Sequence, residues 1–387
     1  MQEDLSTTSL FKKRMSYLGN GDQYFYKEPL HITKGEDVWL FDKEGKKYLD
    51  VYNNVAHVGH CNPVVVDAMV NQAAKLNTNT RYLHEHIVDL AEAIIESMPE
   101  GLNVCYFCCS GSEANDLAFQ IARNNTGNKG CLVTENAYHG NTTAVFQMSP
   151  EDCTANQRES WIGTIPGPQE YLEDEVRCIQ KTKDQVTKLK SHNHSIAAFI
   201  ADNIFSSEGI YLPREGYLQT LYALVKDLGG LTIADEVQSG FGRTGDFMWG
   251  FEHSGVVPDI VTLGKPMGNG HPISAVITTR EIADGFNRDY GYFNTFGGNP
   301  VSCAAGLAVI RYIKDNNLVK HAKTVGNYFQ KKLVRTIGTN DLVKDIRGSG
   351  LFIGIEMKDD TITSSTVEQL MNNGELVGQT GPNNNVM

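Results

Sequence analysis

The chain has 387 residues, of which 41% are hydrophobic and 21% charged, and its formal net charge is −12. These values predict a globular protein with one large and one smaller domain, and the negative charge argues against nucleic-acid or anionic-membrane partners. No apolar run approaches the length of a membrane span, the start of the chain is unlike a signal peptide, and eight dispersed cysteines are typical of a reducing compartment. We therefore expect a soluble intracellular protein, cytoplasmic or mitochondrial.

The first 63 residues contain two short β-like runs, 37–42 and 47–51, on either side of a turn at Gly45, which predicts a hairpin. From residue 64 onwards the pattern becomes helical, with helices predicted at 64–76 and 87–97. Short apolar strands then alternate with helices, and these strands are predicted at 103–107, 130–134, 196–201, 231–234 and 260–263. This alternation indicates a mainly parallel sheet covered by helices on both faces.

Two further helices and a second β-containing region are predicted at 303–316, 319–336 and 346–357. The predicted fold class is therefore α/β. We expect a large α/β domain over residues 60–300, and a smaller α+β domain built from residues 1–59 together with residues 301–387.

Four of the predicted strands end in residues that suit ligand binding, and ligands of parallel sheets bind beyond the carboxyl ends of the strands. Ser110-Gly111-Ser112 follows the first of these strands and opens a helix. Small residues at a helix start let backbone N–H groups approach an anion, which the helix dipole also favours. Gly111 and Ser112 are therefore candidates for phosphate binding. The alternative is that Ser112 is an ordinary N-cap without a ligand.

Tyr138 and the pair Asp235-Glu236 follow two further strands. An aromatic ring at a strand end suits stacking on a flat heterocycle, although local packing of Tyr138 at the rim is an equal alternative. Asp235 beside a pyridine nitrogen would keep that nitrogen protonated. Val237 could pack against one face of the ring, and Gln238 could donate a hydrogen bond to the ring hydroxyl. A metal-binding acid or an N-cap pair are the alternatives for the two carboxylates.

Lys265 follows the last of the four strands, within a loop rich in glycine and proline. Desolvation there would lower the pKa of its amine, which Schiff-base formation requires. A phosphate cradle, a stacking ring, a ring-nitrogen acid and an amine together predict one cofactor, pyridoxal 5′-phosphate, bound to Lys265 with Asp235 at its ring nitrogen. Gly240–Gly245 matches a dinucleotide motif, but no apolar helix follows it. We predict no metal site.

These motifs resemble the class III pyridoxal-phosphate aminotransferases, which have fold type I. The resemblance is carried, in the order typical of the family, by Ser110–Asn115, Tyr138–Gly140, Asp235–Gln238, Gly240–Gly245, Lys265 and Thr295–Pro300. Residues 53–61, 76–81 and 264–272 are similar to one branch of this family. That branch holds the phospho-lyases of ethanolamine phosphate and 5-phosphohydroxylysine, also called alanine–glyoxylate aminotransferase 2-like.

The resemblance implies the cofactor contacts already predicted from the four strand ends. It also implies that Thr295 reaches the phosphate of the neighbouring subunit's cofactor, so that the enzyme is a homodimer or a higher even oligomer with shared active sites. His57 and Arg81 are candidates for binding the phosphate of a substrate, because of their charge and because of the resemblance to this branch.

Two departures from the family's pattern affect its carboxylate-recognising residues. Asp202 stands where the family usually has a longer glutamate, and the arginine that pairs with that glutamate is missing. The chain also stops at Met387, where relatives continue into a strand with basic residues and a closing helix. We expect this shortened C-terminus to leave an unpaired sheet edge in the smaller domain.

The function predicted from the resemblance is β-elimination of phosphate from a phosphorylated amine, with a small-molecule amine as substrate. The products are an aldehyde, ammonia and phosphate. One alternative is transamination to a 2-oxo acid, of the alanine–glyoxylate type. A second alternative is an inactive subunit that binds the cofactor and serves as a dimer partner.

Overall fold

The computed structural model describes residues 6–19, 24–382 and 385–387. The first five residues, on which the expected lack of a signal peptide partly rests, lie outside the described residues. Among the described residues, no helix combines the length and the apolar character needed to cross a bilayer.

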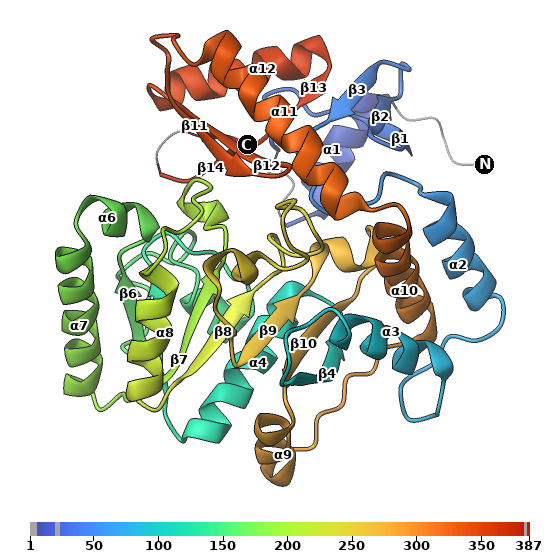
Figure 1. Cartoon of the computed structure of the whole chain (residues 1–387). Coiled ribbons are helices and arrows are strands. Elements are labelled where there is room, and N and C mark those ends of the chain that lie inside the picture. Colours follow the sequence, from blue (N-terminus) through green and yellow to red (C-terminus); the bar gives the residue numbers. More distant parts are fainter. Residues whose placement is uncertain (1–5, 20–23, 383–384) are drawn as a thin grey trace.

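The largest sheet has seven strands in the order β4-β10-β9-β8-β7-β5-β6 (Figure 1). Their bounds are β4 Leu102–Cys108, β5 Gly130–Thr134, β6 Ile162–Ile165, β7 Ile196–Asp202, β8 Leu231–Asp235, β9 Ile260–Leu263 and β10 Ser274–Thr279. The strands from β6 to β9 pair in parallel, whereas β10 runs antiparallel between β9 and β4. The prediction of a mainly parallel sheet is confirmed, but β6 and the antiparallel β10 were not predicted.

Helices cover both faces of this sheet (Figure 1). Their bounds are α2 Pro63–Ala73, α3 Glu85–Ile95, α4 Gly111–Thr126, α5 Thr143–Gln147, α6 Pro168–Glu173, α7 Glu175–Ser191, α8 Tyr217–Asp227, α9 Arg280–Asp289 and α10 Pro300–Asp315. Successive residues of β7 alternate between the two cores: Phe199 packs with the α8 side, and Ala198 and Ile200 pack with α4. Strands buried on both faces explain why the apolar runs could be recognised in the sequence.

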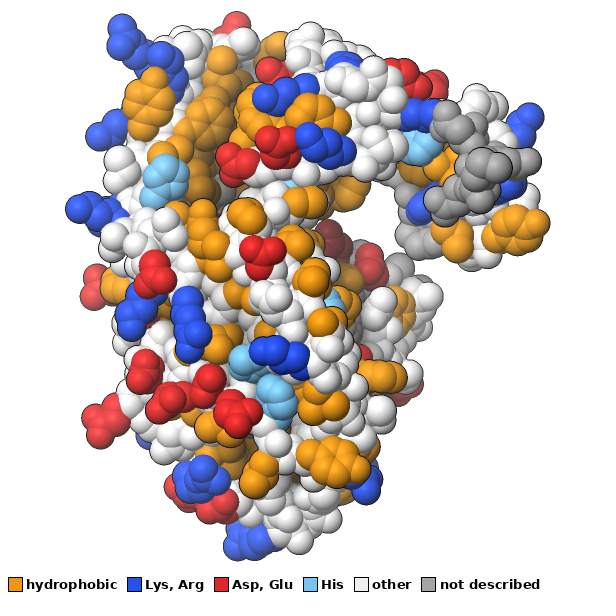
Figure 2. All heavy atoms as spheres, turned by 90° about the vertical axis from the view of Figure 1, so that its right-hand side faces the viewer, with side chains coloured by type: hydrophobic (Ala, Val, Ile, Leu, Met, Phe, Trp, Pro, Cys, Tyr) orange, Lys and Arg blue, Asp and Glu red, His pale blue; other side chains and the backbone are white. Residues whose placement is uncertain are grey.

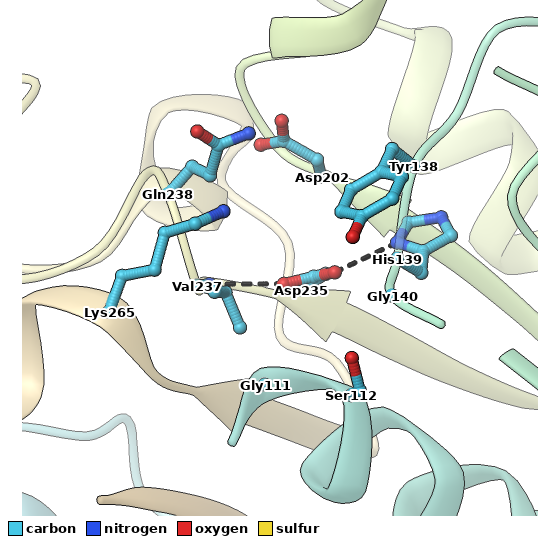
Figure 3. A pocket seen from close by; sticks show the side chains of 10 residues that line it. All are labelled: Gly111, Ser112, Tyr138, His139, Gly140, Asp202, Asp235, Val237, Gln238 and Lys265. Atoms are coloured by element: carbon cyan, nitrogen blue, oxygen red, sulfur yellow. Dashed lines mark hydrogen bonds and ion pairs between the residues drawn. The ribbon is translucent and has the colours of Figure 1, made fainter. Parts of the chain in front are cut away.

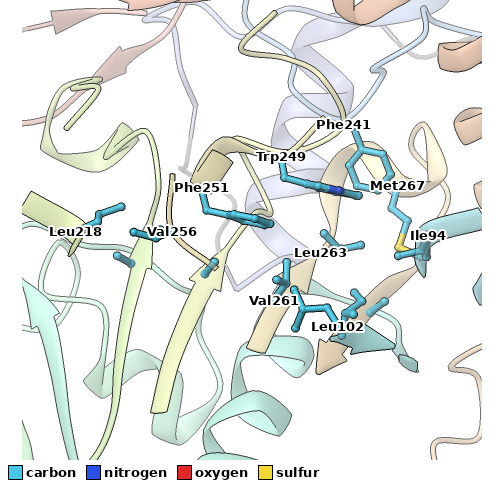
Figure 4. Close-up of a cluster of buried hydrophobic side chains, with 14 of the residues drawn as sticks. Ile94, Leu102, Leu218, Phe241, Trp249, Phe251, Val256, Val261, Leu263 and Met267 are labelled. Carbon is cyan, nitrogen blue, oxygen red and sulfur yellow. The ribbon is translucent and has the colours of Figure 1, made fainter. Parts of the chain in front are cut away.

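The larger of the two cores lies on the α8 side and contains Trp249, Phe241 and Phe251, all fully buried (Figure 4). Trp249 donates its ring N–H to the carbonyl oxygen of Ser97 at 2.9 Å. Because this hydrogen bond satisfies the polar atom of a large buried ring, the core fixes the segment that follows β8. That segment leads directly away from the strand end at Asp235.

Two smaller sheets complete the fold; the first combines segments from both ends of the chain, and the second is built from C-terminal strands. The first has the order β1-β2-β3-β13, and the second has the order β11-β12-β15-β14. The bounds of the remaining elements are α1 Thr7–Tyr17, β1 Ile32–Glu36, β2 Trp39–Asp42, β3 Lys47–Asp50, α11 Leu318–Ile337, β11 Val343–Ser349, β12 Phe352–Met357, α12 Asp360–Asn373, β13 Glu375–Leu376, β14 Gln379–Thr380 and β15 Asn385–Val386. The antiparallel pair β2–β3 confirms the predicted hairpin.

The expected unpaired edge in the second small sheet is wrong at Ile355 and Glu356. These residues of β12 pair with Val386 and Asn385 of β15, so the last described residues cover this side of β12. Val386 and Asn385 also pair with Gln379 and Thr380 of β14, so that β14 forms the outer strand of this antiparallel sheet. Backbone groups that would otherwise lack partners are thereby satisfied.

Gly326 on α11 provides a test of how this helix packs on the second small sheet. A Cβ atom at Gly326 would overlap with the carbonyl oxygen of Gly350, at the turn between β11 and β12. Alanine favours a helix over glycine by about 1 kcal/mol, but the overlap with backbone is the larger effect. We expect Gly326→Ala to lower the free energy of unfolding by about 1–3 kcal/mol in chemical denaturation.

The control is Val334→Ala, at an exposed position of the same helix, which should change the free energy by no more than about 0.5 kcal/mol. A stabilised Gly326→Ala protein would contradict the close approach of α11 to the turn.

Candidate active site

A pocket lies at the carboxyl ends of β7, β8 and β9, next to the start of α4 (Figure 3). The ten residues that line it are Gly111, Ser112, Tyr138, His139, Gly140, Asp202, Asp235, Val237, Gln238 and Lys265. The structure thus brings together seven of the residues predicted from the sequence, from four separate strand ends. His139, Gly140 and Asp202 complete the lining and were not among the predicted site residues.

Asp235 is a buried carboxylate, with 4% of its surface exposed. Its Oδ1 atom accepts a hydrogen bond from the backbone N–H of Val237 at 3.0 Å. Its Oδ2 atom accepts from Asn115 Nδ2 and from His139 Nδ1, both at 2.8 Å. Because a carboxylate only accepts, the hydrogen of His139 is assigned to Nδ1. Three donors therefore hold Asp235 in one orientation within the pocket wall.

Asn115 joins this carboxylate to two further elements. Its Nδ2 atom also donates to the carbonyl oxygen of His139 at 2.7 Å, and its Oδ1 atom accepts from Thr262 Oγ1 of β9 at 2.6 Å. Asn115 is 1% exposed, so each of these bonds replaces a contact with water. Sequence reasoning missed Asn115 and His139 as supports of Asp235. The available signal was a polar residue on the predicted buried face of α4 and a histidine next to Tyr138.

Glu236, the second acid of the pair, points away from the pocket. It accepts hydrogen bonds from Asn203 Nδ2, from Ser239 Oγ and from the backbone N–H groups of Gly250 and Phe251. Burial raises the pKa of Glu236 to about 8. The two carboxylates therefore point to different places. No α-helix begins directly after them, so the alternative that they are an N-cap pair is wrong.

Lys265 begins a short 3-10 helix, Lys265–Gly268, directly after β9. Its backbone has a φ of +23°, in the region that favours glycine, so the reactive position is held in a rarely populated conformation. Burial lowers the pKa of Lys265 from its ordinary value of 10.5, and the nearby carboxylates of Asp235 and Asp202 oppose this effect. The neutral amine needed for reaction with a carbonyl is thus favoured relative to an exposed lysine.

The start of α4 lies so close to its neighbours that Gly111 and Gly140 have little room for a side chain. A Cβ atom on Gly140 would overlap with Ser112 Oγ, and one on Gly111 would lie 3.1 Å from the side chain of Val237. The N-cap of α4 is Ser110, whose hydroxyl accepts from Glu113 N–H at 3.2 Å. The interpretation of Ser112 as the N-cap is therefore wrong. Gly111 and Ser112 instead supply the first N–H groups of the helix, a suitable donor set for a phosphate.

Gln238 contributes the amide side of the pocket and is held at both of its polar atoms. Its Nε2 atom donates to Ser206 Oγ at 2.7 Å, and its Oε1 atom accepts from Asn54 Nδ2 at 2.8 Å. Tyr138 lines the same pocket with its ring partly exposed, and burial raises the pKa of its hydroxyl group. A buried amine, an oriented acid, a partly exposed ring and a helix start together fit the chemical groups of pyridoxal phosphate.

Three predicted residues lie outside the lining of this pocket. His57 donates from Nε2 to the carbonyl oxygen of Phe241 at 2.7 Å and accepts at Nδ1 from Arg243 Nη2 at 2.9 Å. Burial lowers its pKa to about 3, so His57 is neutral with both ring nitrogens in use inside the protein. Arg81 and Thr295 are exposed, and the guanidinium of Arg81 lies 4.4 Å from the ring centroid of Phe293.

Residues 23–387 match the family model described as aminotransferase class-III, and the chain belongs to this family of pyridoxal-phosphate enzymes with fold type I. A protein of Drosophila melanogaster named alanine–glyoxylate aminotransferase 2-like is 40% identical over 100% of this chain and 83% of its own length. Ethanolamine-phosphate phospho-lyase homolog 1 of Caenorhabditis elegans is 36% identical over 99% of this chain and 88% of its own length.

The structure is also similar to that of a phospholyase from Arthrobacter in complex with phosphoethanolamine. The TM-score is 0.93 at 40% sequence identity, and the similarity covers 97% of this chain and 93% of the other.

Asn115 tests the support of the buried carboxylate. Asn115→Ala removes one donor from Asp235 and leaves Thr262 Oγ1 without its acceptor. We expect the free energy of unfolding to fall by about 1–3 kcal/mol, because buried polar groups lose their partners. Gln120→Ala on the same helix is the control, since Gln120 is exposed and its side chain donates to Asp116 at the surface. Equal stability of the two variants would contradict the role of Asn115.

Proposed function

We propose that the chain binds pyridoxal 5′-phosphate in the pocket described above, within a large domain of residues 60–300, and eliminates phosphate from a phosphorylated amine. Ethanolamine phosphate and 5-phosphohydroxylysine are the substrates of this class. The observation that carries the proposal is the convergence of a buried amine, a buried carboxylate and a helix start on one pocket. The names of the relatives from Caenorhabditis elegans and Arthrobacter support the substrate class.

When bound, pyridoxal phosphate supplies a carbonyl group that reacts with amines and a pyridine ring that takes up negative charge. In this proposal Lys265 holds the cofactor, and Asp235 keeps the ring nitrogen protonated. The start of α4 binds the phosphate group. Tyr138 stacks on the ring, and the second N–H of the Gln238 amide donates to the ring hydroxyl.

The proton transfers in this proposal are made by Lys265. Once the amine of the substrate takes the place of Lys265 on the cofactor, the freed neutral amine of Lys265 would take the proton from the amine-bearing carbon of the substrate. Phosphate then leaves from the neighbouring carbon with the electron pair of the broken C–O bond, and water converts the remaining product to an aldehyde and ammonia. Burial lowers the pKa of Lys265, which raises the fraction of the amine that can accept a proton at neutral pH.

Transamination is the second candidate function, because the relative from Drosophila melanogaster is named alanine–glyoxylate aminotransferase 2-like. Both reactions begin with removal of the same proton by the same lysine. A transaminase of this kind must also bind the carboxylate of a 2-oxo acid, usually with an arginine. No arginine is among the residues that line the pocket in the described parts of the chain, which favours the elimination reaction.

We also propose that two copies pair through an exposed apolar surface formed by Leu76, Tyr82, Leu83, Phe293 and Phe296, called the 76–296 surface below. These side chains are between 45% and 103% exposed. The segments 76–84 and 298–300 line a common hollow, and Arg81 stacks on Phe293, so the two parts of the surface adjoin. Figure 2 looks onto the side of the molecule that carries α2 and α10, where hydrophobic side chains are exposed between charged ones.

Pairing through this surface would explain the positions of two predicted site residues. Thr295 and Arg81 lie on or beside the 76–296 surface and point to solvent rather than into their own pocket. In a dimer, Thr295 of one copy would reach the cofactor phosphate of the other, and Arg81 would supply a cation for the phosphate of the substrate.

Phosphate release tests the proposed reaction. The purified holoenzyme should release inorganic phosphate from ethanolamine phosphate or from 5-phosphohydroxylysine without added 2-oxo acid, measured in a colorimetric phosphate assay. Lys265→Ala should lose this activity, because it lacks the amine that moves the proton, and it should lose the cofactor signal that borohydride fixes to the wild-type chain.

Phosphate release that depends on a 2-oxo acid would favour transamination instead. A protein that binds the cofactor but performs neither reaction would favour an inactive dimer partner.

The oligomeric state tests the 76–296 surface. Leu83→Arg would place a charge at the centre of an apolar contact, so we expect this variant to sediment at about half the mass of the wild-type protein. Val176→Arg is the control, because Val176 is 79% exposed on α7, away from this surface, and its variant should keep the wild-type mass. A wild-type monomer in sedimentation would overturn the proposed pairing.

A further inference from the structure

We propose that Asp202 determines substrate specificity by excluding amines that carry a carboxylate on the amine-bearing carbon. The inference rests on the proposed function, because it takes Lys265 as the point where the substrate amine reacts. It goes further by stating which amines the pocket rejects and by assigning this selection to one side chain.

Asp202 is the last residue of β7 and lies next to Asp235 in the register of the sheet. Both carboxylates line the same pocket as Lys265. Figure 3 shows Asp202 beside the amide of Gln238, on the side of the pocket where the amine of Lys265 ends. A substrate whose amine reaches Lys265 therefore brings its amine-bearing carbon into the neighbourhood of Asp202.

The carboxylate of Asp202 is fixed by donors that carry no charge. Oδ1 accepts from the backbone N–H of Ile204 at 3.1 Å, and Oδ2 accepts from Ser206 N–H at 2.8 Å and from the Ser206 hydroxyl. The Ser206 hydroxyl in turn accepts from Gln238 Nε2, whose amide oxygen accepts from Asn54. This chain of hydrogen bonds prevents Asp202 from turning out of the pocket.

Asp202 has no arginine, lysine or histidine as an ion-pair partner among the residues that the structure describes. Burial raises the pKa of Asp202, and the hydrogen bonds from Ser206 and Ile204 oppose this effect only in part. Since all three bonds are donated to the carboxylate oxygens, they stabilise its ionised form. The pocket thus presents, close to the reacting amine, an oriented carboxylate that has no ion-pair partner among the described residues.

A second carboxylate at this position would face the carboxylate of Asp202 in a partly enclosed pocket, where repulsion between like charges is stronger than in bulk water. Ethanolamine phosphate has no carboxylate on its amine-bearing carbon, and its charged phosphate is attached one carbon further away. In 5-phosphohydroxylysine the carboxylate is separated from the reacting amine by the length of the side chain. A 2-amino acid that reacts through its α-amine cannot avoid this repulsion.

The test compares two substrates that differ by one carboxylate, ethanolamine phosphate and O-phosphoserine. Both can lose phosphate by elimination, and the wild-type holoenzyme should have the higher kcat/KM for ethanolamine phosphate. We expect Asp202→Asn to reduce this preference by about 10-fold or more, because the repulsion is removed. Asp202→Glu retains the charge and should keep the preference, which makes it the matched control.

A second pair, ethylamine and L-alanine, separates this inference from the proposed function. These amines also differ by one carboxylate but carry no phosphate, and their binding to the holoenzyme can be followed by the change in its visible absorbance. The wild-type protein should bind ethylamine more tightly than L-alanine, and Asp202→Asn should reduce the ratio of the two Kd values by about 10-fold. Asp202→Ser is the second neutral variant, for use if Asp202→Asn folds poorly by circular dichroism.

The outcomes are distinguishable. If wild-type protein releases no phosphate from ethanolamine phosphate but shows the expected Kd ratios, the proposed function fails and the role of Asp202 stands. If both neutral variants keep the wild-type ratios, or if the wild-type protein binds L-alanine as tightly as ethylamine, the role of Asp202 is overturned.

Discussion

The active-site pocket depends on holding the almost completely buried carboxylate of Asp235 in one orientation. An isolated carboxylate in such a place would take up a proton or draw in water. Here the donors come from three separate elements: Asn115 on α4, His139 after β5 and the backbone of Val237 after β8. The hydrogen bonds that stabilise the charge therefore also bind a helix and two strand ends to each other, and the geometry of the pocket follows from satisfying one carboxylate.

The same constraint explains why the surrounding segments contain so little side-chain volume. Gly111 lies against Val237, and Gly264 lies against Val237 and the backbone of Gly111, so the start of α4 and the end of β9 approach each other closely. The close approach leaves room for the first N–H groups of α4 to face the pocket beside Lys265. Bulkier residues would push the helix start away from the strand ends and separate the anion-binding groups from the amine.

Much of this arrangement could be predicted from the sequence, because the strands are buried on both faces and read as continuous apolar runs that end in Asp235 and Lys265. The supports of Asp235 could not be predicted in this way. Asn115 and His139 are 120 and 96 residues from it in the chain, and only the strand order brings them together. The antiparallel direction of β10 has no local signal either. His57 shows the opposite case. It was a candidate for binding the substrate phosphate, but both of its ring nitrogens form hydrogen bonds inside the protein.

The two aspartates at neighbouring strand ends differ in burial and in surroundings, since Asp235 is buried and Asp202 is partly exposed, and these differences separate their proposed tasks. Asp235 has a histidine and an asparagine fixed behind it, so its charge is directed at the centre of the pocket. Asp202 is fixed by Ser206 and Ile204, which hold it without neutralising it. In the proposed reaction a pyridinium nitrogen would pair with Asp235, whereas Asp202 has no ion-pair partner among the described residues. In the role proposed for Asp202, an approaching ammonium group would be attracted and an approaching carboxylate repelled, so that substrates would be selected by a residue that takes no part in the proton transfer.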